Sequence, residues 1–323
     1  NLPNVSSIDD FLQLGREYGE KYPHQFEESI TNSQPDDLIS FTYTSGTTGA
    51  PKAGMYTSRN IIASARYLPD AISVTRDDFY VCFLPLAHIA ERLVGHFIRF
   101  ISGHPAAFAE SIEDMPQNIR QTGPTIVFGT PRVWEKFYAR ILTGIGDATW
   151  IQKKLFHWAI NVGKENCEIK ESGKTPGFGM KVRLRIAKFF IHDKIKDIFG
   201  GKIRTILTGA APISREIIHF FNWVGLDVYE AYGMTETSGV ITIQSEGKTK
   251  IGSVGIPIPG TELKILEDGE ICCRGEQNIS GYYKNEEATN ELLKPDGEGG
   301  FWLHTGDVGH IDEEGYLFIT DRK

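Results

Sequence analysis

The chain has 323 residues, of which 40% are hydrophobic and 24% charged, as in globular proteins with room for two domains or one large domain with an appendage. Its net charge of −8 argues against a nucleic-acid partner held by phosphate contacts. No run approaches the ~20 apolar residues of a membrane span, and no signal-peptide pattern begins the chain. We therefore expect a cytoplasmic protein. Peripheral membrane contact, anchoring through segments outside this chain and the oligomeric state stay open.

The four cysteines give no sign of a metal centre or of a disulfide framework. Cys272 and Cys273 are adjacent, whereas Cys82 and Cys167 lie far from them in the sequence. No CxxC motif and no Cys/His spacing typical of zinc sites occurs. We expect inert, buried thiols in a reducing compartment.

Short β-rich runs alternate with helical patterns from residue 36 to residue 143. The run DDLISFTY at 36–43 predicts a buried strand that leads into a glycine-rich loop, and Ser58 is a suitable cap for the helix that follows. Further strands are predicted in FYVCFLP, AAFAE and TIVFGT, with one helix near 88–102 and another from Pro131. This alternation predicts an α/β fold, a doubly wound and mostly parallel sheet with helices on both faces.

The pattern changes twice in the second half of the chain. Residues 144–200 are helical and lysine-rich, which predicts a surface helical insertion with a flexible link at 171–179. The α/β alternation resumes with KIRTILTGAAP, ISREIIHFFNWVG and DVYEAYG. From about residue 251 short strands such as ELKILED and EICCRG stand between glycine and proline turns. We therefore expect a large α/β region over 1–250 and a small β-rich subdomain over 251–323.

The stretch TYTSGTTGAPKAG at 42–54 is too rich in glycine and hydroxyl side chains for a stable helix or a packed strand interior. Its backbone amides and hydroxyls suit an anion, with Lys52 as a charge at the rim, although a plain turn remains an alternative. The spacing does not fit GxxxxGK[ST], and the chain has neither a GxGxxG after a strand nor a GxSxG elbow. The loop therefore indicates phosphate binding of another design.

This loop is the first of six motifs that occur in a family's order. They are YTSGTTGAPK at 43–52, LPLAHIAER at 84–92, LTGAAP at 207–212, VYEAYGMTET at 228–237, WLHTGD at 302–307 and ITDRK at 319–323. With them the chain resembles, over essentially its whole length, the adenylate-forming superfamily of acyl-CoA synthetases, aryl-CoA ligases, luciferases and peptide-synthetase adenylation domains.

The resemblance implies activation of a carboxylic acid by ATP to an acyl-adenylate, with release of pyrophosphate and then transfer of the acyl group to a thiol such as CoA. The crowded, highly charged transition state needs metal and fixed donors. By resemblance Thr47 and Glu236 help to bind Mg²⁺, a hard cation that prefers oxygen ligands, and Thr235 contacts the α-phosphate. The expected phosphate ligands are Thr44, Ser45, Gly46, Thr47, Thr48, Gly49 and Lys52.

The same resemblance implies a nucleoside site. Tyr232 is expected to stack against adenine, and Asp307 and Arg322 are expected to hold the ribose hydroxyls. The residues expected to frame the base are Gly209, Ala210, Ala211 and Glu230, and Gly233 is a further expected nucleotide-binding residue. His88 is expected near the acyl carboxylate and the thiol approach, which would place it with Lys52, Thr235 and Glu236 in the catalytic group.

Each of these residues also has a purely structural alternative. Asp307 could form a turn with Gly306, Tyr232 could be a core aromatic and Glu236 a solvated surface charge. The resemblance favours the functional role for these three, and for His88 both alternatives stay open. The aromatic residues expected to pack in the core or under the insertion are Trp134, Phe137, Tyr138, Trp150 and Trp158.

Within the superfamily, GTPRVWEKFYARI at 129–141 and LPLAHIAER resemble the long-chain fatty acyl-CoA synthetases, as does the insertion before LTGAAP. A fatty acid, ATP and CoA are thus the expected partners. The chain departs from the family in having only 42 residues before its phosphate-loop motif and in ending where the hinge is expected. We expect the C-terminal lid domain, with its catalytic lysine, to lie outside this chain. The chain alone is then expected to be inactive. A non-catalytic nucleotide-binding fragment and a ligase for another acid are the alternatives.

Overall fold

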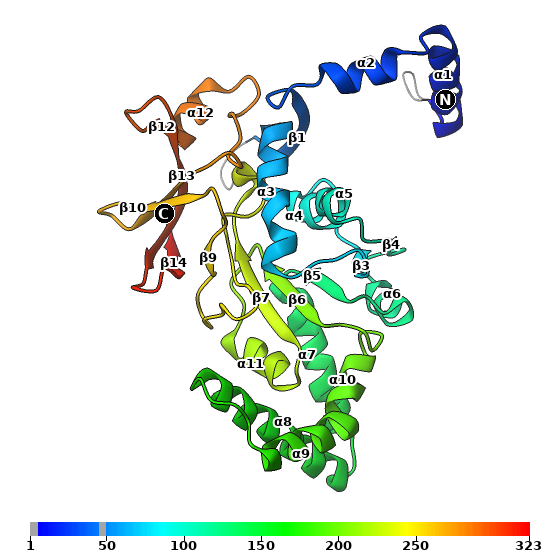
Figure 1. Ribbon diagram of the computed structural model, residues 1–323, viewed down its shortest axis with the longest axis vertical. Coiled ribbons are helices and arrows are strands. Elements are labelled where there is room, and N and C mark those ends of the chain that lie inside the picture. The colour runs from blue at the N-terminus through cyan, green and yellow to red at the C-terminus, as the bar shows by residue number, and fades with distance from the viewer. Residues whose placement is uncertain (1–5, 45–49) are drawn as a thin grey trace.

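The computed structural model describes residues 6–44 and 50–323. Its centre is a seven-stranded sheet in the order β4-β3-β5-β6-β7-β8-β9 (Figure 1). The first five strands in that order run parallel, and the last two pair antiparallel. The strands are β3 (Tyr80–Cys82), β4 (Ala106–Phe108), β5 (Ile126–Gly129), β6 (Thr205–Gly209), β7 (Asp227–Tyr232), β8 (Thr242–Ile243) and β9 (Ile256–Pro257).

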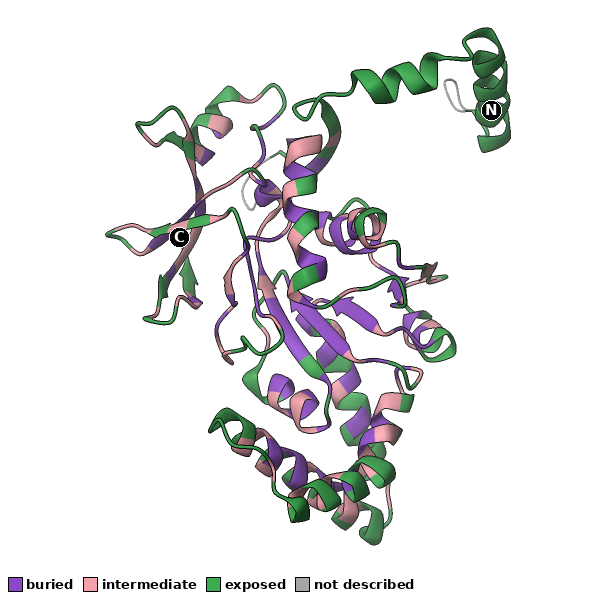
Figure 2. Ribbon diagram, viewed as in Figure 1, coloured by how far each residue is buried: buried purple, intermediate pink, exposed green. Residues whose placement is uncertain are grey.

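Helices cover both faces of this sheet, which confirms the predicted doubly wound α/β fold. On one face lie α3 (Ser58–Ala71), the π-helix Arg92–Phe97 and α5 (Ile98–Ser102), whose buried side chains pack against β5 and β6. On the other face lie α6 (Met115–Thr122), α7 (Pro131–Gly146) and α11 (Arg215–Trp223). The central strands are buried by this double cover (Figure 2).

Two helices differ in detail from the sequence-based expectation. The cap of α3 is Thr57, whose side chain accepts a hydrogen bond from the Asn60 amide, so the prediction of Ser58 was wrong by one residue. The helix expected near 88–102 is composite: α4 (Ile89–Glu91) continues into the π-helix and then into α5. Apolar spacing alone does not distinguish a π-turn from an α-turn.

The prediction of a buried strand at 36–43 was wrong in its burial. β1 (Leu38–Thr44) pairs antiparallel with β2 (Lys52–Thr57) outside the central sheet, and only Thr42 in β1 is buried. Tyr43 is 69% exposed because only one described strand pairs with β1. Before β1, the helices α1 (Ile8–Lys21) and α2 (Gln25–Asn32) have no buried residues and extend away from the sheet (Figure 1).

The segment after α7 is a helical hairpin at the end of the molecule remote from β10–β14 (Figure 1). It comprises α8 (Trp150–Glu171), α9 (Phe178–Ala187), a second π-helix (Lys188–His192) and α10 (Asp193–Asp197). Trp134 and Phe137 lie in the core as expected, but Trp150 is 69% exposed and lies against the Lys154 ammonium, so its predicted burial was wrong. None of the helices in the described residues is both long enough and apolar enough to span a membrane.

The last part of the chain forms a five-stranded antiparallel sheet. The chain path in this sheet is β10-β11-β13-β12, with β14 paired to β13. Its elements are β10 (Glu262–Ile265), β11 (Glu270–Arg274), α12 (Glu286–Leu292), β12 (Leu293–Pro295), β13 (Phe301–Ile311) and β14 (Leu317–Arg322). The domain limits at 250 and 251 and the insertion limits at 144 and 200 stay predictions.

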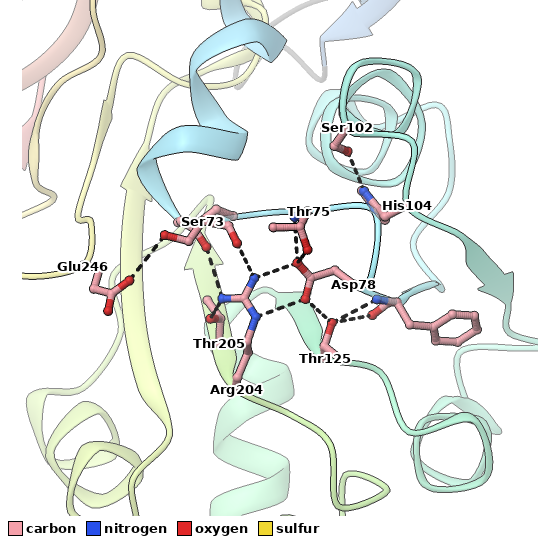
Figure 3. Close-up of polar contacts among 11 residues, drawn as sticks. Ser73, Thr75, Asp78, Ser102, His104, Thr125, Arg204, Thr205 and Glu246 are labelled. Atoms are coloured by element: carbon pink, nitrogen blue, oxygen red, sulfur yellow. Dashed lines mark hydrogen bonds and ion pairs between the residues drawn. The ribbon is translucent and has the colours of Figure 1, made fainter.

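A charged network ties the connection after α3 to two strands of the central sheet (Figure 3). The carboxylate of Asp78 accepts hydrogen bonds from Arg204 at 2.8 and 3.0 Å and from the Thr125 hydroxyl at 2.6 Å. Arg204 also donates to the backbone carbonyl of Ser73 at 2.7 Å. Although burial by itself raises its pKa, these donors lower the pKa of Asp78 to about 2.

Candidate active site

A cavity of about 890 Å³ opens between the carboxyl ends of the parallel strands, β1–β2 and the antiparallel sheet. In open α/β sheets, ligands bind at this edge. Of the expected site residues that the structure describes, nine line the cavity: Thr44, Lys52, His88, Gly209, Ala210, Gly233, Thr235, Glu236 and Arg322. An apolar part of the lining comes from α3, the π-helix region and the sheet: Leu68, Ile72, Leu93, Val94, Ile98, Phe128, Leu207, Val240 and Ile243.

Glu236 and Lys52 meet at Tyr282, a residue that the sequence analysis did not select. The Tyr282 hydroxyl donates to Glu236 Oε1 at 2.5 Å, and the Lys52 ammonium lies 5.3 Å from the centre of the Tyr282 ring. Backbone bonds hold Tyr282 there, because Met55 N–H donates to the Gly281 carbonyl and Tyr283 N–H donates to the Ala53 carbonyl. The only signal in the sequence was the tyrosine pair at 282 and 283, which carries no spacing rule.

Thr235 and Glu236 lie on a short 3₁₀ helix, Thr235–Thr237, directly after β7. A second unselected tyrosine fixes this turn: Tyr56 on β2 is fully buried and donates its hydroxyl to the Thr235 carbonyl at 2.6 Å. The Ile279 amide in addition donates to the Glu236 carbonyl at 2.9 Å. The side chains of Thr235 and Glu236 are thereby held at the cavity wall by elements from three parts of the chain.

Tyr232, Asp307 and Arg322 are close together. The Tyr232 hydroxyl donates to Asp307 Oδ2 at 2.7 Å, and Arg322 Nε lies 3.5 Å from Asp307 Oδ1. Asp307 and Arg322 are cross-strand neighbours on β13 and β14. The Tyr232 ring is 9% exposed and packs in the apolar cluster that includes Tyr56 and Ile241. Its expected stacking against adenine stays a prediction.

Close backbone approach explains the glycines at the ends of β6 and β7. A Cβ atom on Gly209 would lie 2.7 Å from the Ala231 carbonyl oxygen, and one on Gly233 would lie 2.4 Å from the Gly239 carbonyl oxygen. Ala210 between these strands adopts a φ of +67°, an unusual conformation for a residue with a side chain. Ala211 is exposed beside it. Gly209, Ala210 and Gly233 line the cavity here with backbone atoms and one methyl group.

Two buried carboxyl groups, those of Glu91 and Glu230, are sequence neighbours of the cavity-lining residues Ala90 and Ala231 and form no ion pair among the described residues. Burial raises the pKa of Glu230 to about 7, with Arg215 as a weaker opposing influence, and its Oε2 has no hydrogen-bond partner among the described residues. Burial likewise raises the pKa of Glu91 to about 7. Glu91 Oε2 accepts from the Leu84 amide at 3.3 Å. Glu230 was expected to frame the base, whereas Glu91 was not selected from the sequence.

His88 and Arg92 belong to the same motif and have different structural roles. His88 caps α4 by accepting a hydrogen bond from the Ala90 amide at Nδ1, and partial burial lowers its pKa. Arg92 donates to the carbonyls of Leu86 and Phe41 at 2.9 and 3.1 Å, which ties the motif loop to β1. His88 thus has a structural bond and a position on the cavity wall at once.

The expected phosphate loop is only partly within the described residues. Ser45, Gly46, Thr47, Thr48 and Gly49 lie outside them, while Thr44 and Lys52 flank the loop as partners at the ends of β1 and β2. Glu236 fits its expected Mg²⁺ role: it is 6% exposed and lines the cavity. Within residues 6–44 and 50–323, the side-chain hydrogen bond to Glu236 uses Oε1, which leaves Oε2 for a cation.

The opposite wall carries an ionic group from the antiparallel sheet. The Lys323 ammonium pairs with Glu270 at 2.8 Å and with Asp268 at 2.5 Å. Burial alone would raise the pKa of Glu270, but Lys323 and His304 lower it. With His304 3.1 Å from Glu270, the last residue of the chain is tied to the cavity rim.

Comparison with known proteins identifies the family to which the chain belongs. Residues 3–283 match the AMP-binding enzyme family. The chain is 33% identical over 300 residues to the putative fatty-acid–CoA ligase fadD11 of Mycobacterium tuberculosis, covering 92% of this chain and 52% of that protein. It is 32% identical over 335 residues to the human long-chain-fatty-acid–CoA ligase ACSBG1, covering 99% and 45%. The chain thus spans about half the length of the curated relatives it matches.

Solved structures agree on the fold. O-succinylbenzoate coenzyme A synthetase (MenE) from Bacillus subtilis in complex with AMP superposes with a TM-score of 0.63 at 25% identity, covering 90% of this chain and 50% of that one. The same enzyme in complex with ATP and a magnesium ion gives a TM-score of 0.63 at 24% identity, covering 90% and 51%. Since the family match extends over most of its length, the chain belongs to the AMP-binding enzyme family of adenylate-forming proteins.

Proposed function

We propose that the protein containing this chain activates a long-chain fatty acid with ATP and transfers the acyl group to CoA. The observation that carries the proposal is the cavity, which joins Lys52, Thr235 and Glu236 to a lining of apolar side chains from α3, the π-helix region and the sheet. A carboxylate among the polar groups and an alkyl chain among the apolar ones match these two linings. The ligase relatives named above support the same substrate class.

In the proposed first step, a carboxylate oxygen attacks the α-phosphorus of ATP, and the bond between the α-phosphorus and the bridging oxygen breaks to release pyrophosphate. In the second step, the thiolate sulfur of CoA attacks the acyl carbon to form a thioester, and the bond from that carbon to the phosphate oxygen breaks to release AMP. Lys52 and Thr235 would hold phosphate oxygens, and Asp307 and Arg322 the ribose. Bound to Glu236, and to Thr47 outside the described residues, Mg²⁺ would supply positive charge to the phosphates.

The remaining predicted site residues would shape the nucleotide pocket in this proposal. Tyr232 would contact adenine beside the backbone wall formed by Gly209, Ala210, Ala211 and Gly233, with Glu230 behind it. Because an ionised carboxylate in a buried site is costly, the raised pKa of Glu230 supports a neutral carboxyl that donates a hydrogen bond there. His88, with its lowered pKa, would face the acyl carboxyl as a neutral imidazole.

The test is pyrophosphate release by the full-length protein with acids from acetate to oleate and with benzoate. We expect oleate-length acids to be preferred, and preference for acetate or benzoate would refute the long-chain assignment. Glu236→Gln should lower the rate by about a hundredfold or more, on the order of 3 kcal/mol, because it removes the charge proposed to hold Mg²⁺. The matched control Glu313→Gln, at an exposed position, should retain the full rate.

A further inference from the structure

The helical hairpin presents an apolar ridge to solvent on α9 and the π-helix after it. Phe178 is 84% exposed and Phe189 71% exposed. Val182 and Ile186 follow Phe178 at intervals of four residues, so these three side chains lie along one side of α9. The opposite side of α9 carries Ala187, which is fully buried against α8.

Basic residues flank this ridge. Residues 173–190 contain Lys174, Lys181, Arg183, Arg185 and Lys188 and no acidic residue, although the whole chain has a net charge of −8. Arg183 pairs with Glu165 on α8 at 2.6 Å. Among the ion pairs of the described residues, the other four cations take no part. We call the set Phe178, Lys181, Val182, Arg185, Ile186, Lys188 and Phe189 the basic ridge.

Exposed apolar residues alone do not single out this surface, because α1 and α2 are exposed as well. Phe11 and Phe26 on those helices are 65% and 74% exposed. Residues 6–34 around them, however, carry six acidic and two basic side chains. An anionic surface would repel that segment and attract the basic ridge. Charge therefore distinguishes the two apolar surfaces.

We propose that the basic ridge docks the protein on the surface of an anionic lipid bilayer. Apolar side chains on one helical face with flanking lysine and arginine are the pattern of a helix that lies in the membrane interface. The high exposure of Phe178 and Phe189 means that they stand out from the surface, so they can enter a fluid headgroup layer. A second copy of the chain is a less suitable partner, because a two-fold symmetric contact through this face would bring the lysines and arginines of the two copies together.

The experiment is co-sedimentation of the full chain with vesicles of two parts phosphatidylcholine to one part phosphatidylserine, and with vesicles of phosphatidylcholine alone. Lys181→Gln/Arg185→Gln should weaken binding to the mixed vesicles roughly twenty-five-fold, because each basic residue near an anionic surface contributes a factor of about five. Phe178→Ser/Phe189→Ser should weaken it at least tenfold, at low and at high salt alike.

Matched controls test the position of the effect. Arg132→Gln/Lys136→Gln removes the same charge from the exposed side of α7 and should leave vesicle binding within twofold of wild type. All substituted side chains are exposed, so circular dichroism and thermal melting should be unchanged. Equal vesicle binding by the Lys181/Arg185 variant and wild type would overturn the proposal. So would equal loss in the α7 control, or a wild-type oligomer that the Phe178/Phe189 variant dissociates without vesicles.

Discussion

The Asp78–Arg204 network allows a quantitative prediction about pH and stability. Asp78 is held at a pKa of about 2 in the folded chain, against an ordinary value of 3.8. Each unit of that difference corresponds to about 1.4 kcal/mol, so the network contributes about 2 kcal/mol once the carboxylate is ionised. Arg204 is 38% exposed, and solvent screening makes this an upper value. Asp78→Asn should lower the free energy of unfolding at pH 7 by about this amount.

The sign of the pH dependence follows from the lowered pKa. The stabilisation is present above pH 4, where the unfolded chain is also ionised, and is lost as the pH falls toward 2. Urea unfolding of wild type and of Asp78→Asn should therefore show a difference at pH 7 that shrinks at pH 3. Asp36→Asn is the matched control, because Asp36 pairs with Arg59 while 73% exposed and its removal should leave the stability close to that of wild type. A difference that is independent of pH, or an equal loss in the control, would refute this reasoning.

Three further predictions concern the cavity and the buried carboxyl group of Glu91. Lys52→Ala in the full-length protein should weaken ATP binding far more than adenosine binding by calorimetry, and equal weakening would mean that Lys52 acts through folding. Gly209→Ala should cost about 1–3 kcal/mol in urea unfolding and weaken AMP binding, because its Cβ would lie 2.7 Å from the Ala231 carbonyl; wild-type values for both would contradict the close approach. Glu91 has a folded pKa raised by burial to about 7, so the stability of wild type relative to Glu91→Gln should fall by roughly 3 kcal/mol as the pH rises from 4.5 through 7, because Glu230 titrates in both proteins and cancels from the difference. Parallel curves for the two proteins would place the Glu91 carboxyl in water.

The sequence predicted β3 and β5 of the central sheet because they are continuous apolar runs, whereas the two-residue strands β8 and β9 were not expected. FYVCFLP and TIVFGT correspond to β3 and β5, in which every residue is buried. A strand covered by helices on both faces has apolar residues on both sides, so the apolar run alone indicates it. DDLISFTY has a similar composition, and β1 is nevertheless largely exposed. An apolar run identifies a strand. Whether that strand is buried depends on other segments that pack on it, and the local sequence pattern does not predict those contacts.

The motifs predicted the residues of the candidate site, but they did not predict the tyrosines that hold these residues in place. Glu236, Lys52, Asp307 and Arg322 were selected because each belongs to a recognisable motif, and the structure places Lys52, Glu236 and Arg322 on one cavity. The bond from Tyr282 to Glu236 joins residues 46 positions apart, and the bond from Tyr56 to the Thr235 carbonyl joins residues 179 positions apart. Such pairs depend on how sheets pack, so no local spacing announces them.

The backbone bonds between β2 and residues 281–283 have a mechanical consequence. Lys52 begins β2, and Tyr282, which holds Glu236, stands opposite Gly54 on the neighbouring segment. Two backbone hydrogen bonds, Met55–Gly281 and Tyr283–Ala53, therefore join the two segments at adjacent residues. The segments cannot slide past one another without breaking both bonds. Lys52 at the start of β2 and Glu236, which accepts a hydrogen bond from Tyr282, are therefore both attached to this one pair of segments. A displacement of β2 is passed to residues 281–283 and so to the tyrosine that positions Glu236, and the backbone at Lys52 and at Tyr282 moves as one unit unless these bonds break.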